Sequence, residues 1–344
     1  MANWGVPLYS KSAVDRAATI LVNPETDSTN RELALAVVNN WRSSHAFPLN
    51  TIQMGLRQRA VSIDGDATTA QRIKRLPSIT GKIERYPDMK LSRMQDIGGC
   101  RVIVSDVIAV RELVAKYKTG NGKHSLDRLD DYIDEKPKDS GYRGVHLIYK
   151  YTSDRNETYN GLRIEIQIRT RLQHAWATAV ETVGFFTLQA LKSSQGGDEW
   201  LRFFALMSSH IAEIEGTLMV PGTPDDRAVR TAEIRQLANE LGVIDKLTVY
   251  GQTLKFAEEN IVGGRDSYFI LKLDASEGNL TVYRFGNLTA ATEAYDGMER
   301  VAAIEDNVDV VLVSVDSLAS LRRAYPNYFL DTATFVELVR RAIR

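Results

Sequence analysis

The stretch from Arg163 to Thr170, RIEIQIRT, has the alternation of a β-strand. Every second residue is apolar and the residues between are polar or charged; the two sets are Leu162, Ile164, Ile166 and Ile168, and Arg163, Glu165, Gln167 and Arg169. A strand repeats every two residues, so one face is buried and the other carries two cations around a carboxylate. That polar face is either a solvated ladder of salt bridges or the floor of a polar site, and the strand alone leaves both open.

The bulk composition is that of a globular protein without a global charge signal. A chain of 344 residues exceeds one typical core, so two domains are expected. Its 43 Lys and Arg residues balance 44 Asp and Glu residues, so any anion site must be a local patch. The single cysteine, Cys100, excludes an intrachain disulfide and a thiolate metal cluster. No apolar run approaches the ~18 residues of a membrane span and the start lacks a signal peptide, so we expect a cytoplasmic protein without a membrane partner.

The order of the expected elements indicates two units. Residues 1 to about 60 show helical spacing with a capping signal at Asp27. Strands are expected at 100–104, 144–152 and 162–170, with helices between and after them. The segment VPGTPDD at 220–226 marks a boundary, so the predicted domains are 1–220 and 221–344. For the second domain we expect helices through about Glu259, then a hairpin, a helix and a buried strand, VDVVLVSV.

The segment from Gln71 to Arg101 is strongly basic. Eight basic residues face three acidic ones there, which would attract an anionic ligand, although such a run is usually a solvated helix face. Within it, Gly98 and Gly99 lie between Asp96 and Arg101. The backbone can therefore approach a ligand closely between a carboxylate and a guanidinium.

A polar loop at 130–144, DDYIDEKPKDSGYRG, delivers Tyr142 to the start of a strand. A tyrosine at such a junction is often a packing residue. Flanked by Lys136, Lys138 and Arg143, it also suits stacking on a base beside phosphates. The loop alone leaves both interpretations open.

Four motifs in this order resemble the synthetase domain of the RelA/SpoT alarmone synthetases: RIKRLPSITGK, DIGGCRVIV, DYIDEKPKDSGYRGVH and IEIQIRT. Four ordered motifs across roughly a hundred residues are more specific than a lone glycine pattern. The resemblance covers about residues 50–215. It implies an α+β fold, with a mixed sheet flanked by helices as in nucleotidyltransferases, and a second small α/β domain follows. It also implies transfer of the β,γ-pyrophosphate of ATP to a ribose 3′-hydroxyl, with release of AMP.

The resemblance implies roles for individual residues. For ATP, Arg72 and Arg101 would sandwich the adenine, and the phosphates would be held by Lys74, Ser78 and Lys82. Asp96 and Glu165 would be the catalytic carboxylates and would bind Mg²⁺, a cation that prefers oxygen ligands. Glu165 would also orient or deprotonate the acceptor hydroxyl. The implied acceptor-binding residues are Tyr142, Lys136, Lys138, His146, Gln167 and Arg169.

Two departures from the family pattern leave the acceptor open. Glu181-Thr182 stands where many nucleotide-using members carry an acidic-histidine pair, and His174 is usually a different residue. GDP or GTP as acceptor would make the protein an alarmone synthetase. The 3′ end of uncharged tRNA would make it a toxin-like blocker of translation, whose substrate needs a basic surface. A catalytically inactive module that binds nucleotide or RNA is disfavoured because Asp96 and Glu165 are both present.

The region after residue 220 shows no phosphate loop, metal spacing or nucleophile constellation. No hydrolase domain precedes the synthetase motifs, so we expect the product to be made and not removed. For the C-terminal domain we expect regulation of the synthetase, as a fused inhibitor, a sensor of a regulatory partner, or a unit that forms a homo-oligomer.

Overall fold

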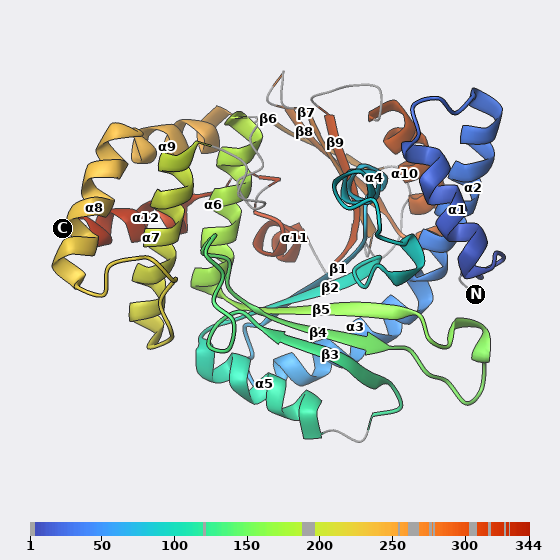
Figure 1. The fold of residues 1–344 in the computed structure, drawn as a ribbon, viewed down its shortest axis with the longest axis horizontal. Coiled ribbons are helices and arrows are strands. Elements are labelled where there is room, and N and C mark those ends of the chain that lie inside the picture. The colour runs from blue at the N-terminus through green and yellow to red at the C-terminus, as the bar shows by residue number, and fades with distance from the viewer. Residues whose placement is uncertain are drawn as a thin grey trace.

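The computed structural model contains one mixed sheet that runs through both halves of the chain (Figure 1). It describes residues 4–119, 122–187, 197–253, 255–260, 268–274, 277, 279–302, 308–315, 318–326, 328–329 and 331–344. Within these residues the sheet has nine strands in the order β3-β4-β5-β2-β1-β9-β7-β8-β6. Helices flank it, which confirms the expected α+β class with a further α/β region after the synthetase motifs.

The N-terminal half supplies three helices and then five strands with helices between them. The elements are α1 (Lys11–Val22), α2 (Ser28–Ser44), α3 (Ala46–Val61), β1 (Thr68–Ile73), α4 (Leu76–Arg85), β2 (Gly98–Val104), α5 (Val107–Thr119), β3 (Ser125–Asp131), β4 (Val145–Lys150), β5 (Arg163–Thr170), α6 (Arg171–Thr187) and α7 (Asp198–Glu215). β5 lies inside the sheet, antiparallel to β4 and parallel to β2. The strand with the strictest alternation in the sequence is therefore a central one.

The apolar face of β5 packs against α3 and α5. Ile164, Ile166 and Ile168 are fully buried in one cluster with Leu56 of α3 and Leu113 of α5. Since side chains alternate along a strand, Glu165, Gln167 and Arg169 point to the opposite face of the sheet. That face is the one on which the candidate site is built.

The C-terminal half adds four strands to the same sheet. Its elements are α8 (Arg227–Glu240), α9 (Val243–Thr253), β6 (Lys255–Asn260), β7 (Tyr268–Asp274), β8 (Asn279–Phe285), α10 (Leu288–Ala302), β9 (Val308–Ser314), α11 (Leu318–Ala324) and α12 (Ala333–Ala342). β9 joins the halves by pairing antiparallel with β1, at Gln71↔Ser314 and Arg72↔Val313. The division at residues 220 and 221 stays a prediction, although the sheet itself is continuous across it.

Helices from both halves also share a core, on the left in Figure 1. Trp200, Phe203 and Phe204 of α7 cluster with Phe335 of α12, together with residues of α6, α8 and α9. On the other side of the molecule, α1 and α2 lie beside α4 and α10 (Figure 1). The C-terminal region thus contacts the N-terminal half at several places.

Some of the helices and strands predicted from the sequence are confirmed, and others are wrong. The expected helical region up to about residue 60 is confirmed and consists of three helices, and Asp27 caps α2 by accepting from the Asn30 N–H at 2.9 Å. The helical spacing of Leu33, Val37 and Trp41 predicts a buried stripe on α2, and this prediction is partly wrong. Trp41 is buried, but Leu33 is 63% exposed, and the other buried apolar positions are Ala34 and Val38. Strand β3 was missed, since its SLDRLDD sequence is charged and mostly exposed. The helices expected after residue 226 are confirmed as α8 and α9, but their continuation to about Glu259 is wrong, because Lys255–Asn260 forms β6, a strand parallel to β8. The hairpin of β7 and β8 is confirmed. Across the described residues, no helix has the length and apolar content needed to cross a membrane.

Candidate active site

A small cavity lies over the polar face of β5 and the neighbouring β1 and β2. Its volume is about 40 Å³, and it is lined by Arg72, Lys74, Asp96, Gly99, Cys100, Arg101, Glu165, Gln167 and Tyr325. Strand register explains the convergence, because Arg72 pairs with Gly99 and Gly99 pairs with Glu165 across the sheet. A Cβ atom at Gly99 would meet nothing within 4 Å, so the missing side chain leaves open space between Arg72 and Glu165.

Asp96 is held between two lysines at one edge of this cavity. Lys74 Nζ donates to Asp96 Oδ2 at 2.7 Å, and Lys82 Nζ lies 3.4 Å from Oδ1. Burial alone would raise the pKa of Asp96, but the charges of Lys74 and Lys82 lower it below its usual value. The Asp96 carboxylate is therefore ionised at neutral pH and offsets part of the positive charge of Lys74 and Lys82.

Glu165 belongs to a closed ring of hydrogen bonds with four side chains. His146 Nδ1 lies 3.0 Å from Glu165 Oε1, and His146 Nε2 lies 2.5 Å from the Tyr142 hydroxyl oxygen. Arg169 Nη2 donates to that oxygen at 2.6 Å and to Gln167 Oε1 at 3.3 Å. Gln167 Nε2 donates to Glu165 Oε2 at 2.6 Å and closes the ring. Both carboxylate oxygens of Glu165 thus accept hydrogen bonds.

The loop that delivers Tyr142 is anchored to α7. Gly141 has φ +85°, a conformation that favours glycine, and its carbonyl accepts from Ser208 Oγ at 2.6 Å. The buried Arg143 donates from Nε to the same Ser208 oxygen at 3.0 Å. The position of Tyr142 is therefore fixed by its two neighbours in the sequence, Gly141 and Arg143, which both bond to Ser208 of α7.

Three members of the ring, Glu165, His146 and Tyr142, have shifted pKa values. Burial would raise the pKa of Glu165, but hydrogen bonding and the charge of His146 lower it. Burial opposes protonation of His146, but the Tyr142 oxygen and the hydrogen bond to Glu165 raise the pKa of His146 to about 9. Burial would likewise raise the pKa of Tyr142, whereas Arg169 and His146 lower it to about 8. At neutral pH the site holds an ionised Glu165 beside a protonated imidazole.

We expect the His146 imidazole to titrate near pH 9, and closer to the ordinary histidine value in a Tyr142→Phe variant that lacks the phenolic oxygen. Since the pKa is raised by folding, the stabilisation from His146 is complete below about 6.5 and is lost as the pH rises through about 9. NMR of the histidine-labelled chain measures the titration. His124, whose pKa burial lowers, is the internal control. An unchanged His146 midpoint in Tyr142→Phe would contradict the ring as described.

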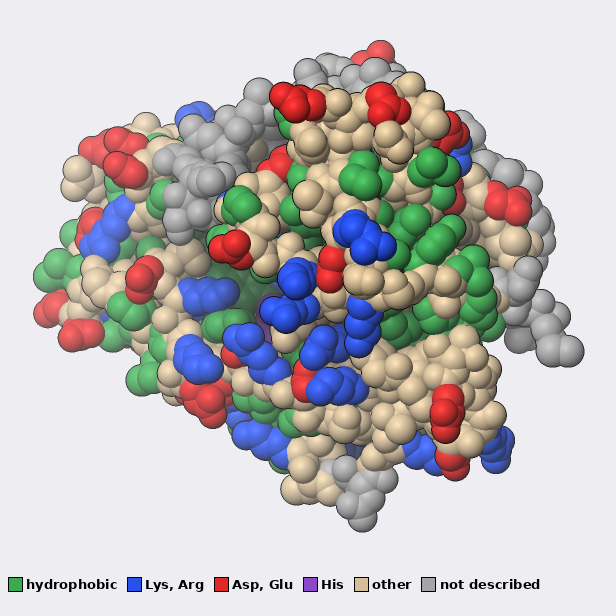
Figure 2. Space-filling view, turned by 45° about the vertical axis from the view of Figure 1, so that its right-hand side comes forward, with side chains coloured by type: hydrophobic (Ala, Val, Ile, Leu, Met, Phe, Trp, Pro, Cys, Tyr) green, Lys and Arg blue, Asp and Glu red, His purple; other side chains and the backbone are tan. Residues whose placement is uncertain are grey.

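The structure brings most of the expected residues together but not all. Arg72, Lys74, Asp96, Arg101, Glu165 and Gln167 line one cavity, and Tyr142, His146 and Arg169 join it through the hydrogen-bond ring. Lys138 lies over the Tyr142 ring at 5.2 Å. Ser78, in the first turn of α4, does not line the cavity, and the exposed Lys136 pairs with Asp130 at 3.5 Å. Figure 2 shows Lys and Arg side chains gathered around a hollow on one face of the molecule.

Comparisons with known proteins identify relatives of part of this chain. Residues 71–183 match the family model described as a region found in RelA / SpoT proteins. Those residues form a RelA/SpoT-type domain. GTP pyrophosphokinase YjbM of Bacillus subtilis is 33% identical over 119 residues, which cover 33% of this chain and 54% of the relative. The uncharacterized protein Rv1366 of Mycobacterium tuberculosis is 27% identical over 178 residues, covering 51% of this chain and 59% of the relative. This chain thus spans little more than half the length of the curated relatives it matches.

Among solved structures, small alarmone synthetase 2 from Bacillus subtilis is 22% identical with a TM-score of 0.43, covering 51% of this chain and 92% of that chain. Small alarmone synthetase 1 from the same organism, bound to its product pppGpp, is 22% identical with a TM-score of 0.43. The match covers 52% of this chain and 94% of that chain.

One residue from outside the RelA/SpoT-type domain enters its cavity, and the sequence analysis missed it. Tyr325 follows α11, and the Arg101 guanidinium lies 5.5 Å from the centre of its ring. Arg101 Nη1 also donates to the Ala324 carbonyl at 3.1 Å. Burial and the charge of Arg169 together lower the pKa of Arg101 to about 10. No sequence signal marked Tyr325, because it approaches the site only through the packing of α11 against β1.

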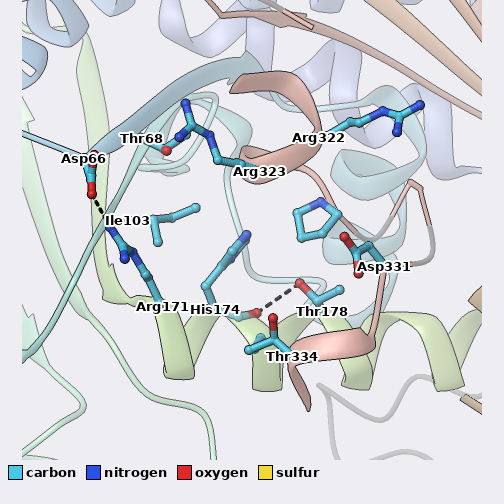
Figure 3. Close-up of a pocket in the computed structure, with 12 residues that line it drawn as sticks. Asp66, Thr68, Ile103, Arg171, His174, Thr178, Arg322, Arg323, Asp331 and Thr334 are labelled. Atoms are coloured by element: carbon cyan, nitrogen blue, oxygen red, sulfur yellow. Dashed lines mark hydrogen bonds and ion pairs between the residues drawn. The ribbon is translucent and has the colours of Figure 1, made fainter. Parts of the chain in front are cut away.

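A larger cavity of about 460 Å³ continues along the same face of β1 and β2 (Figure 3). Thr68 and Ile103 line it, on the strands that carry Arg72 and Arg101 to the small cavity. Its other walls come from α6 and from the segment of Arg323 and Pro326. The segment that carries Tyr325 therefore borders both cavities.

Proposed function

We propose that this chain is a pyrophosphokinase that transfers the β,γ-pyrophosphate of ATP to the 3′-hydroxyl of GDP or GTP. The observation that carries the proposal is the convergence of two carboxylates, Asp96 and Glu165, with the cations Arg72, Lys74 and Arg101 on one cavity. Cations offset the charge of a triphosphate, and a carboxylate can accept the proton of the attacking hydroxyl. Relatives named as GTP pyrophosphokinases support the same chemistry.

In the proposed reaction the 3′-oxygen of the acceptor attacks the β-phosphorus of ATP. The bond from that phosphorus to the oxygen shared with the α-phosphate breaks, and AMP leaves. Glu165 takes the proton of the 3′-hydroxyl, and the hydrogen bonds from His146 and Gln167 keep Glu165 ionised and oriented beforehand. Lys74 lines the same cavity and would bind the phosphates, while Arg72 and Arg101 would hold the adenine between them.

Mg²⁺ would be held by Asp96 and Glu165. The donor set fits, because both carboxylates line one cavity and Mg²⁺ needs only one or two carboxylates when a nucleotide and waters supply the other oxygens. Across the described residues no group of three or more His, Cys, Asp and Glu side chains is arranged to hold a metal. When bound, the ion would supply positive charge at the phosphates.

We propose also that the C-terminal region restrains this activity by closing the ATP site. A nucleotide needs a pocket of roughly 300 Å³ or more, and the cavity between Arg72, Arg101 and Glu165 holds about 40 Å³. The Tyr325 ring occupies the face of Arg101 on which an adenine ring would stack. Movement of the segment that carries Tyr325 would join this cavity to the 460 Å³ cavity beside it.

The activity and its restraint are tested in one assay. Purified wild type, Tyr325→Ala and Tyr325→Phe are incubated with Mg²⁺ and ATP labelled at the γ-phosphate, with GDP, GTP and deacylated tRNA offered separately. We expect label on the guanosine nucleotide, at least tenfold faster for Tyr325→Ala than for wild type. Tyr325→Phe should resemble wild type, because the ring over Arg101 is kept.

Two results would change this conclusion. Label on tRNA alone would replace the proposed acceptor by an RNA 3′ end and leave the transfer chemistry intact. No labelled product from any of the three proteins would reject the pyrophosphokinase itself.

A further inference from the structure

A second cavity lies on the opposite face of the sheet from Glu165. It has a volume of about 450 Å³, within the range of small-molecule sites. Its walls are α3, the end of α5, the segment just before β3 and the chain that follows β4. Tyr149 of β4 lines this cavity, whereas the residue before it in the strand, Ile148, pairs with Glu165 and points to the opposite face. The two sites are thus separated by the thickness of one sheet.

The floor of this cavity is aromatic. Tyr117, Tyr149 and Tyr151 are each less than 9% exposed, and the half-buried His124 ring stacks on Tyr151 with 4.8 Å between ring centres and 28° between planes. The Thr152 N–H donates to His124 Nδ1 at 3.1 Å. An accepting Nδ1 belongs to the neutral imidazole with its proton on Nε2, in agreement with the pKa of His124, which burial lowers. The floor therefore offers a flat neutral ring and an N–H donor.

One polar atom of the floor has no partner. The Tyr117 hydroxyl is buried and forms no hydrogen bond within the described residues, although the Tyr149 hydroxyl nearby donates to the Tyr117 carbonyl at 2.9 Å. A buried hydroxyl without a partner is costly. A ligand with a polar edge that reached the floor would remove this cost.

The rim of the cavity is cationic. Four basic side chains line it, Arg59, Lys116, Lys123 and Arg155, against a single carboxylate, Asp154. Lys123 pairs with Asp154 at 2.7 Å, but both are more than 60% exposed, so the pair is weak and readily exchanged for another anion. Among the residues that the structure describes, Lys116 donates to the neutral Ser62 hydroxyl, at 2.8 Å, and no carboxylate there pairs with its charge. The charge surplus at this rim contrasts with the overall neutrality of the chain.

We propose that this cavity is a second nucleotide site, in which the base or ribose of a nucleoside phosphate lies against His124 and the phosphates lie among Lys116, Lys123 and Arg155. Aromatic floors with cationic rims suit this ligand because rings stack and phosphates pair with Lys and Arg. The ligand has two sources, a free nucleotide or the end of a single-stranded RNA, which present the same groups.

Photolabelling of the full chain tests this site without any catalytic readout. The chain is irradiated with 8-azido-GDP, and labelled peptides are located by mass spectrometry. We expect label in 116–124 or 149–155, in addition to any label near Tyr142 and Arg101. In the charge-reversed variant Lys123→Glu/Arg155→Glu, the amount of label in these two segments should fall at least tenfold. The matched control, Arg16→Glu/Lys118→Glu, reverses two exposed cations outside the cavity and should keep it.

Competitors identify the source. Removal of the label by unlabelled GDP alone supports a free nucleotide, and removal by both GDP and a short single-stranded RNA supports the shared chemistry. Inorganic phosphate that competes as well as GDP would overturn the proposal, because the aromatic floor would then play no part. Label confined to the Tyr142 and Arg101 peptides, or equal label in the charge-reversed and control variants, would also overturn it. These readouts are independent of whether pyrophosphate transfer occurs.

Discussion

Replacement of Glu165 by glutamine is expected to lower pyrophosphate transfer by about 100- to 10,000-fold, the usual contribution of a general base. The substitution keeps the shape of the side chain and removes the charge that takes the proton and that would hold Mg²⁺. It also removes the ionised partner of His146, so the pKa of His146 should fall at the same time. The rate is measured in proteins that also carry Tyr325→Ala, because we expect the proposed ATP site to be open in that background.

The control for this variant is Glu112→Gln, which changes an exposed carboxylate of α5 and should leave the rate unchanged. Thermal unfolding of Glu112→Gln should match that of the parent. Glu165→Gln should still fold, since no side-chain volume is lost, but it should unfold at a lower temperature at neutral pH because the pKa of His146 is no longer raised by an ionised partner. A Glu165→Gln enzyme that retained more than a third of the parent rate would exclude Glu165 as the base. Another group would then have to accept the proton of the 3′-hydroxyl.

The part of the site that could be predicted from sequence is the part that depends on short-range periodicity. The alternation in β5 places Glu165, Gln167 and Arg169 on one face, because the period of a strand is local. His146 joins them through strand register, with His146 opposite Gln167 in the β4–β5 pair. Register was not deducible from either strand alone, so the resemblance to a known family was needed to group these residues.

The part that could not be predicted depends on pairing over long distances in the chain. β1 and β9 lie more than two hundred residues apart in the chain, and their short antiparallel contact brings α11 and Tyr325 to the small cavity beside Arg101. Nothing in the sequence around Tyr325 has the spacing of a ligand site, and the C-terminal region therefore looked silent. The same limit explains β6, where KFAEEN lacks the apolar alternation of a half-buried strand.

A buried ion pair also links the two halves of the chain. Arg42 of α2 donates to both oxygens of Glu299 in α10, at 2.8 and 3.0 Å, and the two side chains are 4% and 7% exposed. Glu299 also accepts from the Tyr295 hydroxyl at 2.5 Å and from the Leu76 N–H at 2.9 Å. Glu299 therefore accepts a hydrogen bond from one free backbone N–H in the first turn of α4, a helix whose N-cap residue makes no side-chain hydrogen bond.

Replacement of Arg42 by methionine is expected to lower the free energy of unfolding by about 3–5 kcal/mol, because it leaves the Glu299 charge buried without its partner. Urea denaturation measures this loss. The double variant Arg42→Met/Glu299→Gln should recover part of it, since the second change removes the unpaired charge while the amide can still accept from Leu76. The control is Arg341→Met, which breaks an exposed pair with Glu337 in α12 and should cost less than about 1 kcal/mol.

The same variant separates two models of how the halves are coupled. If α10 holds the C-terminal strands and Tyr325 in place, Arg42→Met should raise pyrophosphate transfer as it lowers stability, because the ATP site opens more often. Tyr325→Ala should then add little to Arg42→Met, since both act on the same closure. Fully additive gains from the two substitutions would mean that Tyr325 closes the site independently of the Arg42–Glu299 pair, through the contact of α11 with Arg101 alone.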